Sequence, residues 1–240
     1  MRRFGIIIIL AAVSATLQAA APGFSVDGSL KLSSAYLWRG DRVCGTHFNP
    51  DICFNIGPFT VENYDFLAFD GSYKEIDWDL SLKAGDFTFH LADYYARYAS
   101  SPVPENFFSW KKGQTNHVDE VALVYDCSTF PLVAKWFTFF WGDWIPDASG
   151  APGALSFSSY LEIGTYHDWE EWGMASLNVG ASILKGAYTG YTRSFAPIHV
   201  ELKYEKQLKA GSFSIPVGAS FVLNPFTRSC YAAAWAGFTF

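Results

Sequence analysis

Residues Glu75-Ile-Asp-Trp-Asp-Leu-Ser-Leu-Lys83 alternate strictly between polar and apolar side chains. The odd-numbered positions are charged or serine, and the even-numbered positions are isoleucine, tryptophan and two leucines. A period of two is the signature of a β-strand with one polar and one apolar face. The stretches 198–204 and 213–221 show related alternation, the second between large apolar and small residues. The sequence therefore predicts an all-β protein.

Strand number and length decide between the two all-β folds that alternation allows. A soluble sandwich turns the apolar face of each strand inward, whereas a membrane barrel turns it outward to lipid. Many of the predicted strands run near the roughly 9–11 residues of a tilted membrane strand, well above the soluble average of about 5–6. The sequence predicts about twelve strands, over residues 28–39, 51–57, 59–69, 74–83, 86–98, 117–126, 131–141, 155–167, 174–184, 197–206, 212–222 and 230–240.

The connections between these strands alternate in length. Short turns lie at 57–58, 84–85, 127–130, 168–173 and 207–211. Longer loops lie at 40–50, 99–116, 142–154, 185–196 and 223–229, and only the 70–73 connection on that side is short. Short periplasmic turns and long outer loops are typical of bacterial barrels. We therefore predict a transmembrane antiparallel up-and-down β-barrel with both termini in the periplasm.

Composition supports a membrane barrel. Aromatic residues make up 18% of the chain and charged residues 17%, against about 25% charged in typical globular domains. Tyrosine and tryptophan gather near predicted strand ends, which suggests interfacial girdles formed by Tyr36, Trp38, Tyr94, Tyr95, Tyr98, Trp136, Trp141, Tyr166, Trp172 and Trp235.

The first residues are predicted to be a targeting segment and not part of the fold. Arg2 and Arg3 precede an apolar run at 4–13 and small residues at 14–22, which is the layout of a secretory signal peptide. The alternative, a membrane helix, needs about 20 apolar residues, and this run is shorter. We predict a signal peptide over 1–21 and a barrel domain over 22–240. The net charge of −6 makes nucleic acid an unexpected partner.

Several motifs resemble one family of membrane proteins. The stretches Leu32–Gly40, Glu75–Leu80, Ala92–Tyr95 and Val222–Pro225, with the closing Gly237–Phe240, are similar to the outer-membrane porins of the TorF-like group. The resemblance implies a small barrel in the lipid of the bacterial outer membrane. Bacterial outer-membrane barrels also resemble this chain in ending on a strand with a terminal phenylalanine, which the barrel-insertion machinery reads. That machinery is therefore an expected partner, through the strand ending at Phe240.

The polar faces of the strands are predicted to line the lumen. They carry seven acids and four fixed bases, together with two histidines: Lys31, Arg39, Glu62, Glu75, Asp77, Asp79, His90, Glu120, Lys135, Glu162, His199, Glu201 and Lys203. An acidic lumen favours cations. We therefore predict a passive, modestly cation-preferring pore for small hydrophilic solutes or ions. Its selectivity candidates are Arg39, Glu62, Asp77, Asp79, Glu120, Glu162, Glu201 and Lys203.

A closed lumen is the alternative to an open pore. About eight strands are filled by their own side chains, while 16–18 leave an aqueous channel, and twelve lie between. The strand 134–141 is apolar on both faces, so Phe137, Phe139 or Trp141 either narrows the pore or packs under the 142–154 loop.

The four cysteines provide a test of the topology. An exported chain is oxidised, and Cys44 and Cys53 flank the first predicted loop, so we predict a Cys44–Cys53 disulfide. Cys127 and Cys230 are predicted at opposite ends of the barrel, too far apart to join. No Cys-x-x-Cys pair is present, and neither a metal site nor a cofactor is expected.

Two other functions stay open beside the pore. One is a non-conducting barrel that displays loops for binding or adhesion, for which the aromatic loop 99–116 is suited, although that loop also has the composition of a lumen plug. The other is an outer-membrane lipid hydrolase using one of His90, His117, His167 or His199 with a serine. The sequence has no Gly-x-Ser-x-Gly motif, so we predict no enzyme.

Overall fold

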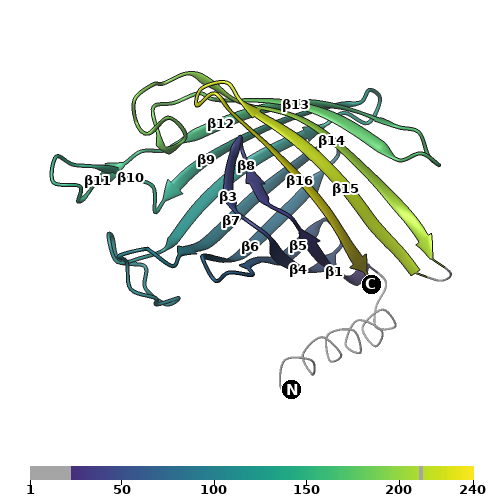
Figure 1. The fold of residues 1–240 in the computed structure, drawn as a ribbon, viewed down its shortest axis with the longest axis horizontal. Helices are drawn as coiled ribbons and strands as arrows, with labels where there is room; N and C mark the ends of the chain where they lie inside the picture. The colour runs from purple at the N-terminus through teal and green to yellow at the C-terminus, as the bar shows by residue number, and fades with distance from the viewer. Residues whose placement is uncertain (1–22, 211–212) are drawn as a thin grey trace, which may run out of the picture.

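The computed structural model describes residues 23–210 and 213–240, and twelve of its strands form one closed antiparallel barrel (Figure 1). The predicted all-β fold, an antiparallel barrel of about twelve strands, is confirmed. The periplasmic position of the termini stays a prediction, and the predicted signal peptide over 1–21 lies outside the described residues. The barrel strands are β1 (Phe24–Ser33), β4 (His47–Ile56), β5 (Phe59–Ala68), β6 (Tyr73–Ala84), β7 (Phe87–Tyr98), β8 (His117–Asp126), β9 (Leu132–Trp141), β12 (Ser159–Asp168), β13 (Met174–Ser182), β14 (Ala196–Ala210), β15 (Phe213–Asn224) and β16 (Ser229–Thr239).

Each barrel strand pairs with the next one along the chain, and β1 closes the barrel against β16. The closing register runs from Ser29 opposite Thr239 to Ser33 opposite Trp235. Three further elements lie outside this sheet: the hairpin of β2 (Tyr36–Trp38) and β3 (Asp41–Cys44), the hairpin of β10 (Trp144–Pro146) and β11 (Pro152–Leu155), and the short 3-10 helix η1 (Ala187–Thr189).

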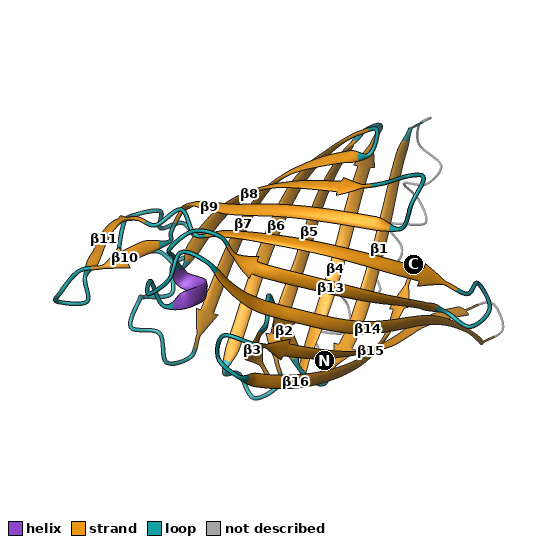
Figure 2. Ribbon diagram, turned by 90° about the horizontal axis from the view of Figure 1, so that it is seen from above, coloured by secondary structure: helices purple, strands orange, loops and turns teal. Residues whose placement is uncertain are grey.

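The two ends of the barrel differ, as the connection lengths predict. One end, called here the turn end, holds Phe24, Thr239 and the connections 57–58, 85–86, 127–131 and 169–173. The other, called the loop end, holds the connections 34–46, 69–72, 99–116, 142–158, 183–195 and 225–228. Hairpin β10–β11 projects beyond the barrel at the loop end (Figures 1 and 2). Gly57 and Gly85 have φ values of +59° and +62°, which two-residue hairpin turns require.

The apolar face of the strands is the outer face. On β6, Glu75, Asp77 and Asp79 are buried on the lumen side, while Trp78 and Leu80 on the opposite face are 43% and 46% exposed. The same exposed apolar belt continues on other strands through Phe48, Phe59, Phe89, Leu91, Trp136, Ile163, Leu177, Val179, Leu202, Phe221 and Phe238. A soluble sandwich would bury this face, so the inverted arrangement excludes the soluble alternative.

The predicted strand 28–39 is wrong at its second half. β1 ends at Ser33, and the chain then folds into hairpin β2–β3, so the first long connection is 34–46 and not 40–50. The hairpin lies within the barrel (Figure 2), where the Tyr36 ring stacks on Phe66 with 3.8 Å between centroids. Burial of this aromatic face inside the lumen outweighs the continuation of the strand.

The predicted aromatic girdle is largely wrong. Tyr94 donates a hydrogen bond to the lumen residue Glu120, and Trp235 lies 5.3 Å from the Lys203 ammonium on the lumen face. Trp136 faces outward and is 41% exposed, as a girdle residue should be. Most of the tyrosines and tryptophans near the strand ends therefore serve the lumen instead of the lipid boundary.

The predicted Cys44–Cys53 disulfide is absent, because all four cysteines are free thiols in the described structure. Cys44 lies in β3 at the loop end, and its Sγ contacts the Gly45 carbonyl. Cys53 lies six residues past the start of β4, roughly 20 Å along that strand at the ordinary rise. A disulfide needs Cα atoms within about 7 Å. Because β4 begins at His47, it carries Cys53 away from Cys44 and too far for a disulfide.

The loop 99–116 packs on the outer wall of the barrel and does not plug the lumen. Tyr95 and His117 are register partners on the outward faces of β7 and β8, because their neighbours Tyr94 and Glu120 face inward. Trp110 stacks on the His117 ring at 4.1 Å, and Phe107 lies 5.1 Å from Tyr95. The structure therefore excludes the interpretation of this loop as a plug.

No helix in the described ranges 23–210 and 213–240 is long and apolar enough to span a membrane.

Candidate functional site

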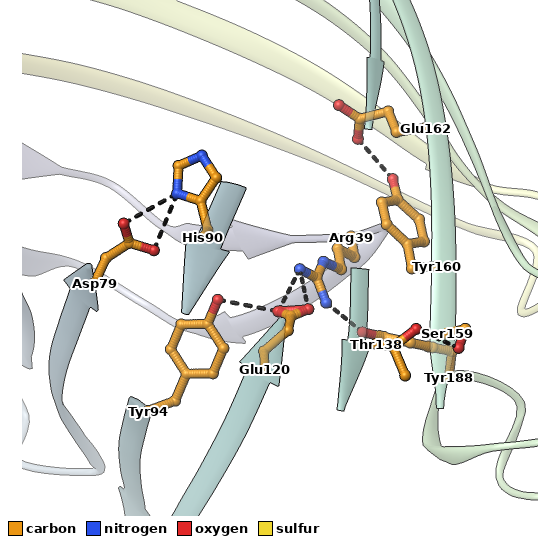
Figure 3. A network of polar contacts seen from close by, with 10 residues as sticks. All are labelled: Arg39, Asp79, His90, Tyr94, Glu120, Thr138, Ser159, Tyr160, Glu162 and Tyr188. Carbon is orange, nitrogen blue, oxygen red and sulfur yellow. Dashed lines mark hydrogen bonds and ion pairs between the residues drawn. The ribbon is translucent and has the colours of Figure 1, made fainter. Parts of the chain in front are cut away.

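The connection between β1 and β4 narrows the middle of the lumen. Hairpin β2–β3 crosses from the β1 wall to the opposite wall, where Arg39 forms a buried ion pair with Glu120 of β8 (Figure 3). The Arg39 Nη2 atom lies 2.7 Å from each carboxylate oxygen of Glu120, and the two side chains are 7% and 1% exposed. The Tyr94 hydroxyl donates to the same carboxylate at 3.0 Å, and Arg39 Nη1 donates to Tyr188.

Aromatic rings surround the Arg39 guanidinium. Its carbon lies 4.1 Å from the Phe137 ring centre, 4.5 Å from Trp38 and 5.1 Å from Tyr160. A guanidinium over aromatic faces gains a cation–π attraction that grows as water is excluded. We call the Arg39–Glu120 pair and its aromatic surround the Arg39 latch.

The turn of hairpin β2–β3 also packs closely against the barrel wall. Gly40 has a φ of +94°, and a Cβ there would overlap the Ile198 carbonyl of β14. Asn224 of β15 donates to the Asp41 carboxylate at 3.1 Å. The hairpin therefore contacts both sides of the barrel.

The hairpin separates the lumen into two parts. Toward the loop end lies a cavity of about 390 Å³ lined by Tyr36, Trp38, strand residues and residues of the loop-end connections. Three other cavities, of about 620, 390 and 280 Å³, have charged strand residues in their lining, and hairpin residues line the first and the third. Solvent can therefore fill the lumen on either side of the hairpin, while the Arg39 latch narrows its middle.

Charge is distributed unevenly around the wall. On β12–β14, Glu162 lies 2.8 Å from Lys135 of β9 and Glu205 lies 2.8 Å from Lys203, while Glu201 lies 3.8 Å from His199. On β4–β6 the lumen acids Asp51, Glu62, Glu75 and Asp77 form no ion pair in the described structure, and Asp79 contacts only His90, at 3.0 Å. The β4–β6 side is therefore the electronegative wall of the lumen.

The structure places the predicted site residues on the lumen face. Arg39 reaches the lumen from the hairpin. The others lie on barrel strands: Glu62 on β5, Asp77 and Asp79 on β6, Glu120 on β8, Glu162 on β12, and Glu201 and Lys203 on β14. Arg39 and Glu120 are brought together, whereas Glu62 and Asp79 face each other as direct cross-strand neighbours. Their roles in selectivity stay predictions.

Sequence reasoning missed two groups of lumen residues. Asp51 lies on the same face of β4 as Cys53, and the alternation of that strand contained the signal. Tyr188 comes from η1 in the 183–195 connection, which bends back into the lumen to meet Arg39. No local pattern marks Tyr188. Both predicted roles for the aromatic residues of strand 134–141 occur. Phe137 and Phe139 lie beside Arg39 in the narrow part of the lumen, whereas Trp141 packs on Trp144 of the 142–158 connection.

One set of side chains on the electronegative wall has the composition of a cation ligand set. Donor atoms of Asp51, Cys53 and Glu62 all lie within 4.8 Å of one another. The Cys53 thiol contacts Asp51 Oδ1 at 3.5 Å, and the Ser29 hydroxyl donates to Asp51 Oδ2 at 3.2 Å. These contacts explain the cluster without a metal.

The histidines contact acids and backbone, not serines. His117 Nδ1 lies 2.8 Å from Asp93, His90 contacts Asp79, and His199 Nε2 lies 3.8 Å from both Glu162 and Glu201. In the described part of the chain no serine hydroxyl bonds to any of them. A serine hydrolase needs such a pair.

No protein-family model matches the chain, and no curated protein matches it in sequence. Several solved structures are similar to the chain at low sequence identity and low TM-score. OmpF of Salmonella typhi, in complex with Daunomycin, is 8% identical with a TM-score of 0.41, covering 90% of this chain and 97% of that one. The translocator domain of autotransporter NalP from Neisseria meningitidis is 12% identical with a TM-score of 0.42, covering 97% and 93%. A BenF-like porin from Pseudomonas fluorescens Pf-5 is 8% identical with a TM-score of 0.36, covering 92% of this chain and 64% of that one.

Proposed function

We propose that the protein is an outer-membrane barrel that acts as a passive, modestly cation-preferring pore for small hydrophilic solutes. The observation that carries this proposal is the electronegative wall on β4–β6, whose acids lack lysine or arginine partners while the opposite wall is paired. Uncompensated carboxylates beside an aqueous path raise the local concentration of cations and exclude anions. The exposed apolar belt supports a place in lipid.

The resemblance to the TorF-like porins belongs to the same proposal. It is carried by the motifs at 32–40, 75–80, 92–95 and 222–225 and by the closing strand. The strand that ends at Phe240 is proposed to be the segment read by the insertion machinery. Phe240 exchanges two backbone hydrogen bonds with Gly28, at 2.9 and 3.0 Å, so this segment also completes the β1–β16 seam.

Removing charge from the electronegative wall tests the pore. We expect the Glu62→Gln/Asp79→Asn variant to lower the cation-to-anion permeability ratio by about two- to fivefold, because a unit charge near an aqueous path is worth about 1 kcal/mol. The measurement is the reversal potential of single channels in a planar bilayer under a salt gradient.

A matched variant controls for net charge. Glu170→Gln/Glu171→Gln removes the same two charges from the exposed turn 169–173, outside the lumen. Its permeability ratio should equal that of the wild type. An equal fall in both variants would show that the ratio reports overall charge and would remove Glu62 and Asp79 from the pore.

A second candidate function is a non-conducting barrel that displays its loops. It is favoured by the hairpin that crosses the lumen and by Phe108 of the 99–116 loop, which is 87% exposed. A folded barrel that stays silent in the bilayer, with the latch intact or removed, would favour this function over the pore.

The orientation in the membrane has its own test. We propose that the turn end lies in the periplasm, so Cys127 should react with a bulky maleimide only after the outer membrane of cells is permeabilised. A Ser149→Cys variant in a background without other cysteines should react in intact cells, because Ser149 lies at the exposed tip of hairpin β10–β11. The reverse pattern would place the loop end in the periplasm.

The pH dependence of that reaction is also predictable. Hydrogen bonds from Thr129 and Tyr125 lower the pKa of the Cys127 thiol to about 7. The thiolate is the reactive species, and it forms as pH rises through the thiol pKa. The labelling rate of the purified barrel should therefore reach half its plateau near pH 7, below the midpoint of an ordinary thiol. In a Thr129→Val variant the midpoint should rise, and an unchanged midpoint would exclude Thr129 as the cause.

A further inference from the structure

The cavity at the loop end of the lumen has a different chemistry from the three other cavities. Its volume is about 390 Å³, within the range of sites for small organic ligands. Aromatic rings from three separate parts of the chain line it: Tyr36 and Trp38 of the hairpin, Tyr73, Tyr98 and Phe139 of the barrel wall, and Trp144 of hairpin β10–β11. The site is thus built by elements that meet only in the folded protein.

The charged residues that line this cavity are all acids. They are Glu75 of β6 and Asp143 of the 142–158 connection, and the lining contains no lysine, arginine or histidine. Asp143 is satisfied by the protein, because the Tyr191 hydroxyl donates to Oδ1 at 2.8 Å and the Ser158 amide donates to Oδ2 at 3.1 Å. Glu75 is therefore the acid of this lining that the protein leaves without a full set of partners.

Glu75 is 6% exposed and has an unused acceptor. Tyr36 and Tyr73 lie close enough to interact with its carboxyl group, but its Oε2 atom has no hydrogen-bond partner among the described residues. A buried carboxylate oxygen without a partner costs free energy that a bound positive group would recover.

We propose that this cavity binds a small organic cation, an ammonium group carried on an apolar body. The ammonium would lie against Glu75, and the apolar body would lie among the aromatic rings, whose faces attract cations. A bare metal ion fits poorly, because calcium takes 6–8 oxygen ligands and this lining is mostly carbon. Anions are repelled by both carboxylates. The proposal goes beyond passive conduction and does not depend on it.

Binding to the refolded full-length barrel in detergent tests the site directly. Benzyltrimethylammonium is the probe, with benzyl alcohol as the neutral comparison and phenylacetate as the anionic one. We expect the cation to bind with a Kd of about 4 mM or below, the affinity that its roughly eleven heavy atoms give at the ligand efficiency usual for drug-sized ligands. Calorimetry measures the affinity, and the fluorescence of Trp38 and Trp144 reports occupancy of the cavity.

Three variants locate the binding. Glu75→Gln keeps the shape of the side chain and should weaken the cation by roughly thirtyfold, the cost of losing one partner of a buried ion pair. Trp144 lies outside the barrel sheet, and the Lys112 ammonium already lies 5.0 Å from its ring centre. Trp144→Leu removes the ring from the cavity lining and should weaken binding of the cation by about tenfold. Glu105→Gln removes a loop-end acid that pairs with Lys74 and Arg97 outside the cavity, and should leave the Kd unchanged.

The proposal is overturned if the ammonium does not bind, if benzyl alcohol binds as tightly as the ammonium, or if Glu75→Gln binds like the wild type. Binding of the ammonium by a barrel that does not conduct would support the proposed binding site and would exclude only the proposed pore function. Circular dichroism of each variant confirms that the barrel is folded before its affinity is compared.

Discussion

Replacing Arg39 with alanine is expected to raise the open probability of single channels by roughly two orders of magnitude. Removing one partner of a buried ion pair costs about 3–5 kcal/mol, because the other charge stays buried without compensation. In the Arg39→Ala variant that charge is Glu120, which is 1% exposed and keeps only the Tyr94 hydroxyl as a partner. This free-energy cost destabilises the state in which hairpin β2–β3 crosses the lumen, so the open state becomes more populated. Planar-bilayer recordings of wild type and variant measure the change.

A paired substitution separates release of the hairpin from loss of charge. Arg39→Met/Glu120→Leu replaces the ion pair with apolar groups of similar size, which is often neutral or stabilising. The aromatic surround of Phe137, Trp38 and Tyr160 suits a methionine side chain. This variant should keep the low open probability of the wild type. Equal open probabilities in Arg39→Ala and the wild type would remove the latch as the element that controls conduction.

The barrel could be predicted from sequence because its physical cause is local. Lipid outside and water inside impose alternation on each strand separately, so β6 shows the rule within nine residues. The hairpin could not be predicted in this way, because the alternation of β1 does not fix the path of residues 34–39. What turns them inward is contact with residues distant in sequence: Phe66 beneath Tyr36, and Glu120, 81 residues beyond Arg39.

The candidate site was likewise predictable only where a local pattern determines it. Period two was enough to assign Glu62, Asp77 and Asp79 to one face. It did not show which lumen acids have a basic partner, because partners come from neighbouring strands and from connections such as the one that carries Tyr188. The electronegative wall is therefore a property of strand order and register, and it was visible only once these were known.

Replacing Asp77 with asparagine is expected to stabilise the folded barrel by about 1–3 kcal/mol, because a buried carboxylate without a partner costs more free energy than a buried amide without one. Asp77 is 0% exposed, and neither carboxylate oxygen has a hydrogen-bond partner in the described structure. Its register neighbours are Tyr64 and Tyr94, and the Tyr94 hydroxyl donates to Glu120 instead. A neutral amide costs less to bury than a charge. Urea unfolding of the barrel in detergent, followed by tryptophan fluorescence, measures the difference.

The same variant tests why a destabilising acid is present on the lumen face. If Asp77 serves cation preference, Asp77→Asn should gain stability and lose part of its cation-to-anion permeability ratio together, which is the trade-off expected where function requires a strained site. Asp126→Asn, at the exposed turn end of β8, is the control and should change stability by less than about 0.5 kcal/mol. A more stable Asp77→Asn barrel with unchanged selectivity would leave Asp77 without a role in conduction. Lower stability would show that its carboxylate is satisfied, because only an unsatisfied charge makes the neutral amide the better group to bury there.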